Sequence, residues 1–269
     1  MVPFSWVFSS ALDANDHEGH SIYDPSLSPT SKPLGGETWG ITYGDGSGAI
    51  GNVYIDNVEV GNTIASNQAV EAATNITYEF EADTNNDGLL GLAFDKINMV
   101  KPTKQKTFFS NVRGSLAAPL FTADLKMGSP GSYDFGFVDS EKYTDALTYV
   151  PVNDSGGFWN FRSNGFAIGK GSFSTASIDS IMDTGTTLLL LPASIVGAYY
   201  AKVRRARYDR AQGGFVFPCS VTLPDLRLGF GTYKATVPGS FIKYAPVDHG
   251  GLSKSYAARE RIANGLPPY

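Results

Sequence analysis

Short segments in which apolar and polar residues alternate recur along this chain between Gly and Asn turns. Residues 52–60 and 147–152 are clear examples, and a two-residue period is typical of half-buried β-strands. Helical patterns are few: in residues 106–112 and 194–201 the aromatic side chains are spaced to share one helix face. The chain contains no tandem repeat and no low-complexity linker. The pattern therefore predicts an all-β protein of the sandwich or barrel type with a few short helices.

The amino-acid composition fits an all-β fold and argues against some classes of binding partner. The 269 residues are 42% apolar and 13% aromatic, enough for one large core or two modest ones, and 30 Gly and 15 Pro supply many turns. A net charge of -5 argues against nucleic acid and against an anionic membrane as partners. No apolar run reaches the length of a membrane span, and the N-terminus lacks the pattern of a signal peptide.

The most informative chemistry lies in an Asp-Thr-Gly-Thr turn between two apolar runs. Residues 180–182 lead into Asp183, and the leucines of 188–191 follow the turn. A tight Gly turn flanked by hydroxyl residues fixes a carboxylate where it can activate water, so Asp183 is the catalytic candidate; the alternative is that it caps its own turn. Such catalysis needs a partner carboxylate, because two acids that share one proton let one act as base while the other stays acidic. The chain contains one Asp-Thr-Gly.

Other motifs give this turn a context. A Tyr-Gly-Asp-Gly-Ser-Gly sequence at 43–48 lies between strand-like residues 37–42 and 50–55, so it is predicted to form a hairpin tip. Residues 85–94 and 133–139 carry further Gly-rich apolar motifs. In order and spacing, these motifs closely resemble the pepsin-like aspartic endopeptidases, most of all the secreted fungal acid proteases. The resemblance runs from about Trp6 to Val247.

The resemblance implies roles for individual residues. Asp183 matches the catalytic aspartate of the family's second lobe, and its turn is supported by Thr184, Gly185 and Thr186. The flap and its substrate-binding positions match Tyr43, Gly44, Asp45 and Ser47, and Trp6 matches an indole that hydrogen-bonds the flap tyrosine. The Leu90-Gly91 pair matches an element that braces the first lobe's active-site loop. Tyr43 and Trp6 could also be ordinary packed aromatic residues.

The implied architecture is bilobal and all-β, with a fold that is incomplete at both termini. We expect residues 1–150 to form an N-terminal lobe that carries the flap, 151–247 to form a C-terminal lobe, and 248–269 to be a tail outside the family. No residue matches the family's first catalytic aspartate, since only residues 1–5 precede Trp6-Val7, and Cys219 lacks its cysteine partner. Either the gene model has misplaced boundaries or the shortened protein is real.

The resemblance implies an acid endopeptidase that needs no metal or cofactor and acts on an extended peptide or protein. With Asp183 alone, the chain is expected to be inactive as a protease in the form given. The alternatives are a non-proteolytic relative whose cleft binds a small molecule or serves in small-molecule biosynthesis, and a dimer in which each copy donates one Asp183. The family is secreted, but this sequence leaves the localisation open.

Rival motifs are weaker. Residues 46–51 match a dinucleotide-binding fingerprint, but a strand-like segment follows where a helix must begin, and an EF-hand-like opening at 83–88 has Phe94 at the position that requires Glu. Residues 17–20, His-Glu-Gly-His, lack the spacing of a zinc site and are expected to form a solvated loop. Four arginines between 204 and 210 are expected to form a solvated face beside a helix.

Overall fold

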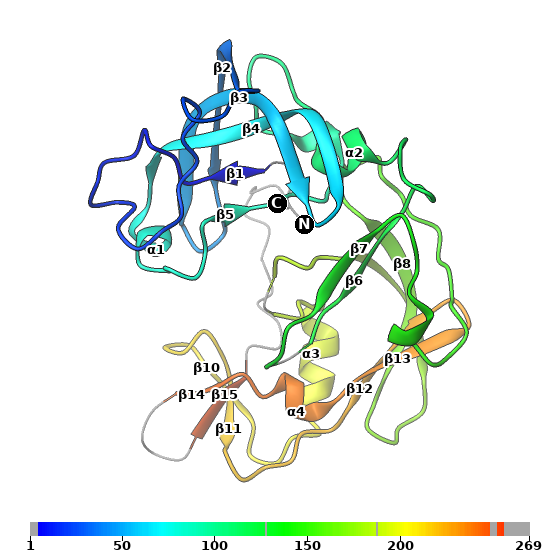
Figure 1. Cartoon of the computed structure of the whole chain (residues 1–269). Coiled ribbons are helices and arrows are strands. Elements are labelled where there is room, and N and C mark those ends of the chain that lie inside the picture. Colours follow the sequence, from blue (N-terminus) through cyan, green and yellow to red (C-terminus); the bar gives the residue numbers. More distant parts are fainter. Residues whose placement is uncertain (1–4, 127, 187, 248–251, 256–269) are drawn as a thin grey trace. The chain divides into compact units, whose positions relative to one another are not determined.

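The computed structural model describes residues 5–126, 128–186, 188–247 and 252–255 and divides the chain into two compact units. The first unit contains residues 5–146 and 154–159, and the second contains residues 147–153 and 160–247 together with 252–255. Each unit has its own sheets, which Figure 1 draws. The predicted all-β class is confirmed, since the few helices are short.

A five-stranded sheet with the order β2-β3-β4-β1-β5 forms the centre of the first unit. The short strand β1 pairs in parallel with β4 and antiparallel with β5. The strands of this sheet are β1 (Trp6–Val7), β2 (Lys32–Thr42), β3 (Gly48–Val60), β4 (Thr63–Ile76) and β5 (Gly88–Leu89). The hairpin and helices that complete the unit are β6 (Phe121–Asp124), β7 (Ser132–Phe135), α1 (Tyr78–Glu81), η1 (Asp95–Ile97), α2 (Phe108–Val112) and η2 (Ser140–Lys142).

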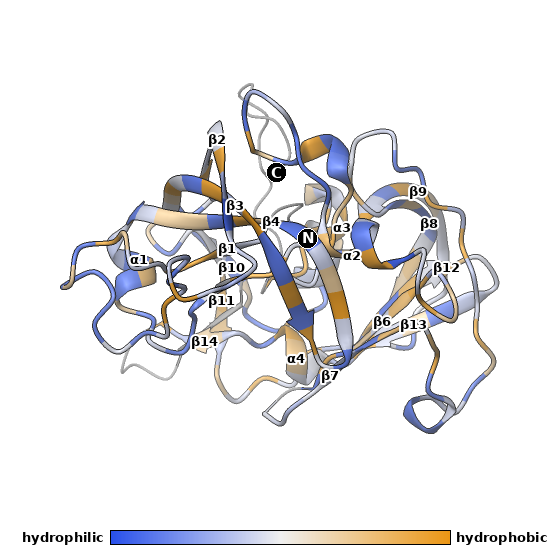
Figure 2. Cartoon of the chain, turned by 45° about the horizontal axis from the view of Figure 1, so that its top comes forward, coloured by the Kyte–Doolittle hydropathy of each residue, from blue (hydrophilic) through white to orange (hydrophobic). Residues whose placement is uncertain are grey.

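Aromatic side chains fill the core of the first unit. Trp6 and Phe8 have no exposed surface, and the rings of Trp6 and Trp39 stack with centroids 5.9 Å apart. In α2, Phe108 and Val112 are spaced four residues apart and are both buried, while the Thr107 hydroxyl caps the helix by accepting from the Ser110 N–H. Figure 2 shows hydrophobic and hydrophilic residues interleaved along the strands, as one-sided burial requires.

The second unit contains two four-stranded sheets, with the orders β13-β12-β8-β9 and β10-β11-β15-β14. Tyr199 and Tyr200 of α3 pack into a buried cluster with Phe217 and Leu226. The elements are β8 (Asn160–Ile168), β9 (Ser174–Ile181), α3 (Ala193–Tyr200), β10 (Arg207–Asp209), β11 (Gly214–Pro218), β12 (Leu226–Phe230), β13 (Tyr233–Val237), α4 (Gly239–Ile242), β14 (Ala245–Pro246) and β15 (Leu252–Ser255). Strand β15 belongs to the stretch 248–269 that was expected to be a non-family tail, and it pairs with β11 and β14; residues 256–269 lie outside the described residues.

Most of the predicted elements are confirmed. Residues 52–60 lie in β3, residues 106–112 contain α2, and residues 194–201 coincide with α3 except at its ends. The strand predicted at 147–152 is wrong: the segment forms no strand. Pro151 cannot donate a ladder hydrogen bond. Leu147, Tyr149 and Val152 are exposed, Tyr149 to 82%, so the segment has no fully buried face that would stabilise a strand.

The prediction that residues 17–20 form a solvated loop is wrong for one residue, His20. The imidazole of His20 is completely buried, stacks on Phe8 with ring centroids 4.0 Å apart, and has each ring nitrogen 3.1 Å from a backbone oxygen, that of Asn86 or Glu81. The neighbouring Glu18 is exposed. Stacking on Phe8 is a long-range contact, which local spacing does not reveal.

Two smaller expectations are confirmed. Strand β3 begins within the Gly-rich residues 46–51, at Gly48, so a strand and not a helix continues from this motif. The four arginines between 204 and 210 lie largely on the surface. Among the described helices, none is long and apolar enough to cross a membrane.

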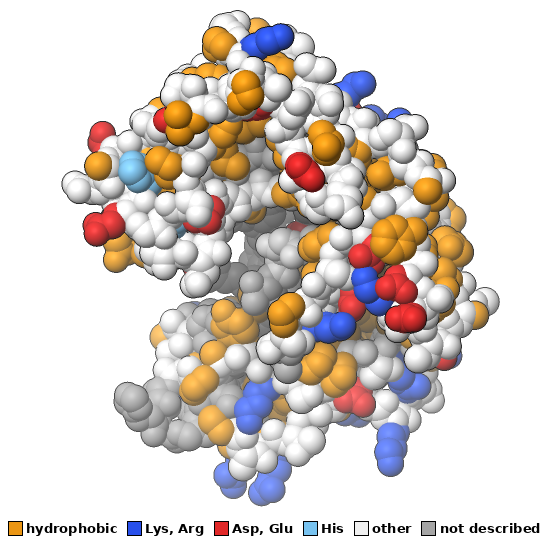
Figure 3. Space-filling view, viewed as in Figure 1, with side chains coloured by type: hydrophobic (Ala, Val, Ile, Leu, Met, Phe, Trp, Pro, Cys, Tyr) orange, Lys and Arg blue, Asp and Glu red, His pale blue; other side chains and the backbone are white. Residues whose placement is uncertain are grey.

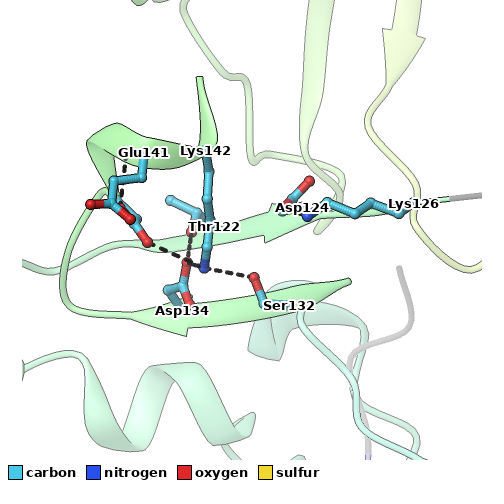
Figure 4. Close-up of polar contacts among 8 residues, drawn as sticks. Thr122, Asp124, Lys126, Ser132, Asp134, Glu141 and Lys142 are labelled. Carbon is cyan, nitrogen blue, oxygen red and sulfur yellow. Dashed lines mark hydrogen bonds and ion pairs between the residues drawn. The ribbon is translucent and has the colours of Figure 1, made fainter. Parts of the chain in front are cut away.

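Lys142 ties η2 to the β6–β7 hairpin. Its Nζ lies 2.5 Å from the Asp134 carboxylate, donates to the Ser132 hydroxyl at 2.7 Å, and lies 3.7 Å from Asp139 (Figure 4). Asp134 also accepts from the Thr122 hydroxyl at 3.2 Å. Figure 3 shows acidic and basic side chains side by side over these strands. The network fixes how η2 lies on the hairpin, although partly exposed ion pairs stabilise a fold only weakly.

Asp56 fixes the long loop that precedes β2. Its side chain is buried, 4% exposed, and its carboxylate accepts hydrogen bonds from the hydroxyls of Tyr23 at 2.8 Å, Ser28 at 3.0 Å and Thr30, and from the Asn57 N–H at 2.7 Å. Burial alone would raise the pKa of Asp56, but the hydrogen bonds to its charged form hold it below the usual value. One carboxylate thus organises three loop residues.

We expect Asp56→Asn to lower the free energy of unfolding of the first unit by about 2 to 3 kcal/mol, because bonds to a charged acceptor are replaced by weaker ones to an amide. Urea denaturation followed by tryptophan fluorescence measures this, since Trp6, Trp39 and Trp159 all lie in the first unit. The exposed Asp13→Asn is the control. Equal effects of the two variants would contradict the role of Asp56.

Candidate active site

The β2–β3 turn is closed by its own backbone. The Tyr43 N–H donates to the Ser47 carbonyl at 2.7 Å and the Gly46 N–H donates to the Tyr43 carbonyl at 3.1 Å. Gly46 has a φ of +96°, a value that side-chain-bearing residues rarely adopt. Asp45 accepts from the Ser47 hydroxyl at 2.7 Å and from the Ser47 N–H at 2.9 Å. These two bonds lower the pKa of Asp45, so an exposed carboxylate is held in one orientation at the tip, next to Gly44.

A buried indole holds the tyrosine of this turn. Trp6 Nε1 donates to the Tyr43 hydroxyl oxygen at 2.9 Å, and Phe80 contacts both rings edge-on with centroid distances of 4.9 and 5.6 Å. Burial, together with the nearby carboxyls of Glu71 and Asp45, raises the pKa of Tyr43 to about 12, although the hydrogen bond from Trp6 acts to lower it. Tyr43 therefore keeps its O–H proton throughout the acid and neutral range.

Glu71 lies beside this pair and was not singled out from the sequence. It sits in the middle of β4, directly opposite Trp6 in the parallel pairing, and is 1% exposed. The available signal was a single acidic residue within the apolar run 69–73, where a strand inside a core should carry no charge. The Leu90-Gly91 pair lies close by, with the Gly91 N–H donating to the Ser5 hydroxyl at 3.3 Å.

In the second unit, the Asp183 carboxylate is oriented by its own turn. Asp183 follows β9, and its Oδ1 accepts from the Gly185 N–H at 2.9 Å while its Oδ2 accepts from the Thr186 hydroxyl at 2.5 Å. Partial burial acts to raise the pKa of Asp183, but the bonds from Thr186 and Gly185 favour the charged form and help to hold the pKa below its usual value. Thr184 completes the turn. Asp183 is exposed as a residue, and its carboxylate is held in one orientation by the turn.

The apolar run after the turn anchors it. Leu189 and Leu191 pack against the buried cluster of the second unit. They also line an apolar cavity of about 220 Å³, together with Val196, Phe241 and other residues of α3, β12 and α4. The catalytic candidate is thereby tied to the core of its own unit.

The predicted site residues thus form two groups. Trp6, Tyr43, Asp45 and Ser47 are joined by hydrogen bonds at one end of the first unit's hairpin. Asp183 is joined to Gly185 and Thr186 in the second unit. Within the described part of the chain, no three His, Cys, Asp or Glu side chains are arranged to hold a metal ion.

The comparison with protein families decides the family. The model for eukaryotic aspartyl proteases matches residues 4–255. The chain belongs to this pepsin-like family. The match extends beyond residue 247, where the resemblance carried by the motifs ends, and includes β15.

Curated fungal proteins of the same family are similar in sequence to this chain. Endothiapepsin from Cryphonectria parasitica is 50% identical over 248 residues, which cover 92% of this chain and 59% of the relative. Penicillopepsin-3 from Penicillium janthinellum is 52% identical over 91% of this chain and 61% of the relative, and aspergillopepsin-1 from Aspergillus oryzae is 53% identical over 91% and 62%. The chain thus spans about three fifths of the length of these relatives.

We expect Thr186→Val to raise the pKa of Asp183, because the variant removes a hydroxyl that donates to the charged carboxylate. The measurement is a ¹³C NMR titration of the Asp183 carboxyl carbon. Thr184→Val is the matched control, because Thr184 belongs to the same turn but is not among the groups that lower the pKa of Asp183. An unchanged pKa in Thr186→Val would show that the hydroxyl does not stabilise the charged form.

Proposed function

We propose that this chain is an aspartic endopeptidase homologue in which Asp183 supplies one of the two carboxylates that activate water. The observation that carries the proposal is the Asp183 turn, in which a backbone N–H and a threonine hydroxyl fix both carboxylate oxygens. The family match and the fungal relatives support it. The substrate class that follows is an extended peptide, and no cofactor takes part.

The chemistry needs two carboxyl groups. The ionised one takes a proton from water as the water oxygen attacks the peptide carbonyl carbon, and the protonated one gives its proton to the carbonyl oxygen. Collapse of the tetrahedral intermediate returns a proton to the amide nitrogen as the C–N bond breaks. The 269 residues contain one Asp-Thr-Gly, so this polypeptide by itself holds one half of the pair and is inactive as a protease.

The flap residues have a separate role in this proposal. Asp45 and Ser47 contact the substrate backbone, and Tyr43, held by Trp6, covers the reacting bond. Their support is the hydrogen-bonded turn described above. Asp183 and Thr186 are not needed for these contacts, so peptide binding and peptide cleavage can be separated by mutation.

A second candidate is a non-proteolytic role in which the Asp183 carboxylate binds or protonates a small molecule. The exposed, oriented carboxylate favours it, because a single acid can act as a proton donor. Ligand binding that is lost in Asp183→Asn, with no cleavage by any form of the protein, would favour this candidate.

We expect the 269-residue polypeptide not to cleave denatured globin or casein between about pH 3 and 5, where a carboxyl pair shares one proton. A chimera that carries ahead of Trp6 the Asp-Thr-Gly segment implied by the family resemblance should cleave. Asp183→Asn in that chimera should lower the rate by roughly 10⁴-fold or more.

Two results would contradict the proposal. Cleavage by the unmodified polypeptide that disappears in Asp183→Asn would instead favour a dimer that pairs two copies of Asp183. A folded but inactive chimera, shown to be folded by its tryptophan fluorescence and cooperative melting, would exclude Asp183 as half of a catalytic pair.

A further inference from the structure

Glu71 is a buried acid with no cation paired to it in the described part of the chain. Its side chain is 1% exposed, Oε1 accepts from the Asn98 side-chain amide at 3.1 Å, and Oε2 has no hydrogen-bond partner among the described residues. None of the ion pairs among these residues includes Glu71. A carboxylate buried in this way would lack compensation for its lost hydration, whereas a neutral carboxylic acid costs far less to bury.

The position of Glu71 connects it to the flap. Its backbone lies opposite Trp6 in the parallel β1–β4 pairing, and its N–H donates to the Ser5 carbonyl at 3.1 Å. Strand β1 has only two residues, and one of them, Trp6, holds the Tyr43 hydroxyl. A charge that disturbed β4 at Glu71 would therefore disturb the strand that positions Tyr43.

Asn98 orients the Glu71 carboxyl group and is itself held by two backbone N–H groups. Its side-chain oxygen accepts from the N–H groups of Val100 and Gln105, both at 3.0 Å, so its amide nitrogen is aimed at Glu71. Asn98 does not titrate. The titratable neighbour is Tyr43, whose pKa of about 12 is raised in part by the Glu71 carboxyl, so Tyr43 stays protonated while Glu71 titrates.

We propose that Glu71 is a positioning residue whose neutral form holds β1 and the Trp6–Tyr43 pair in place, and whose ionisation releases them. The flap group is then assembled at acid pH and loosened as the pH rises. Its meaning for catalysis rests on the proposed function, in which Tyr43 belongs to the flap, but the structural change does not depend on any activity.

The direction of the pH effect follows from linkage. Burial raises the pKa of Glu71 from 4.5 to about 8, against the opposing bond from Asn98. A pKa that is higher in the folded state means stabilisation that is complete below about pH 4.5 and is lost as the pH rises through about 8. Each unit of pKa difference is a tenfold change in the folding equilibrium, so the total loss between pH 4.5 and 8 and beyond is roughly 3,000-fold.

The test follows the indole N–H signals of the full chain by ¹⁵N NMR from about pH 4 to 9, a range that spans both pKa values of Glu71, with Trp6→Phe to assign the Trp6 signal among three tryptophans. In the wild type we expect the Trp6 signal to shift or broaden as the pH rises through about 8, and the melting temperature to fall progressively above about pH 4.5. Glu71→Gln should abolish both changes. Glu59→Gln, a glutamate nearer the surface on the neighbouring strand β3, should leave them as in the wild type.

Two outcomes would overturn the proposal. One is a pH transition in Glu71→Gln that coincides with that of the wild type, because the titrating group would then lie elsewhere. The other is failure of both Glu71→Gln and the apolar Glu71→Met to fold at about pH 4 to 5, because neutral side chains of similar size should be tolerated there. Neither readout uses peptidase activity, so an inactive polypeptide does not affect the result.

Discussion

The hydrogen bond from Trp6 to Tyr43 is the interaction on which the first unit's candidate site depends. It joins a two-residue strand in the middle of a sheet to the tip of a hairpin formed by other strands. Because the indole has no exposed surface, water cannot substitute for the tyrosine oxygen as its acceptor, and a buried unpaired donor is costly. The position of Tyr43 is therefore set by the core of the unit rather than by the turn alone.

Strand β1 cannot hold Trp6 by itself. Two residues form few ladder bonds, so its place is defined by β4 on one side and β5 on the other. The stacking of Trp6 on Trp39 and its edge contact with Phe80 add packing that a short strand lacks. Any change in β4 that alters its pairing with β1 thus reaches the flap through one strand.

The features that could be predicted from the sequence are local. Asp45 and Asp183 each accept one hydrogen bond from the backbone N–H two residues later and one from a nearby hydroxyl group. These partners lie within the same short sequence motif, so the motif alone indicates them. The β2–β3 hairpin and helices α2 and α3 follow from periodicity for the same reason. His20, Asp56 and Glu71 could not be predicted, because Phe8, Tyr23 and Asn98, which determine their environments, come from distant segments. The prediction of a strand at 147–152 was wrong because, among the described residues, no other element covers this segment, so its alternating apolar side chains have no core to pack against.

The hydrogen-bonded acids Asp45 and Asp56 and the buried acid Glu71 stabilise the fold in opposite pH ranges. Hydrogen bonds to the charged form lower the pKa of Asp45 and Asp56, so their turn and loop are intact once the pH exceeds those lowered values. Burial raises the pKa of Glu71 to about 8, so its site is intact below that range. In mildly acid solution Asp56 is ionised and Glu71 is neutral. The charged Asp56 carboxylate then holds its loop, and the uncharged Glu71 side chain leaves the pairing of β4 with β1 undisturbed. The placement of these three carboxyls thus favours the first unit's turn, loop and strand in mildly acid solution, independently of the carboxyl pair that would perform catalysis.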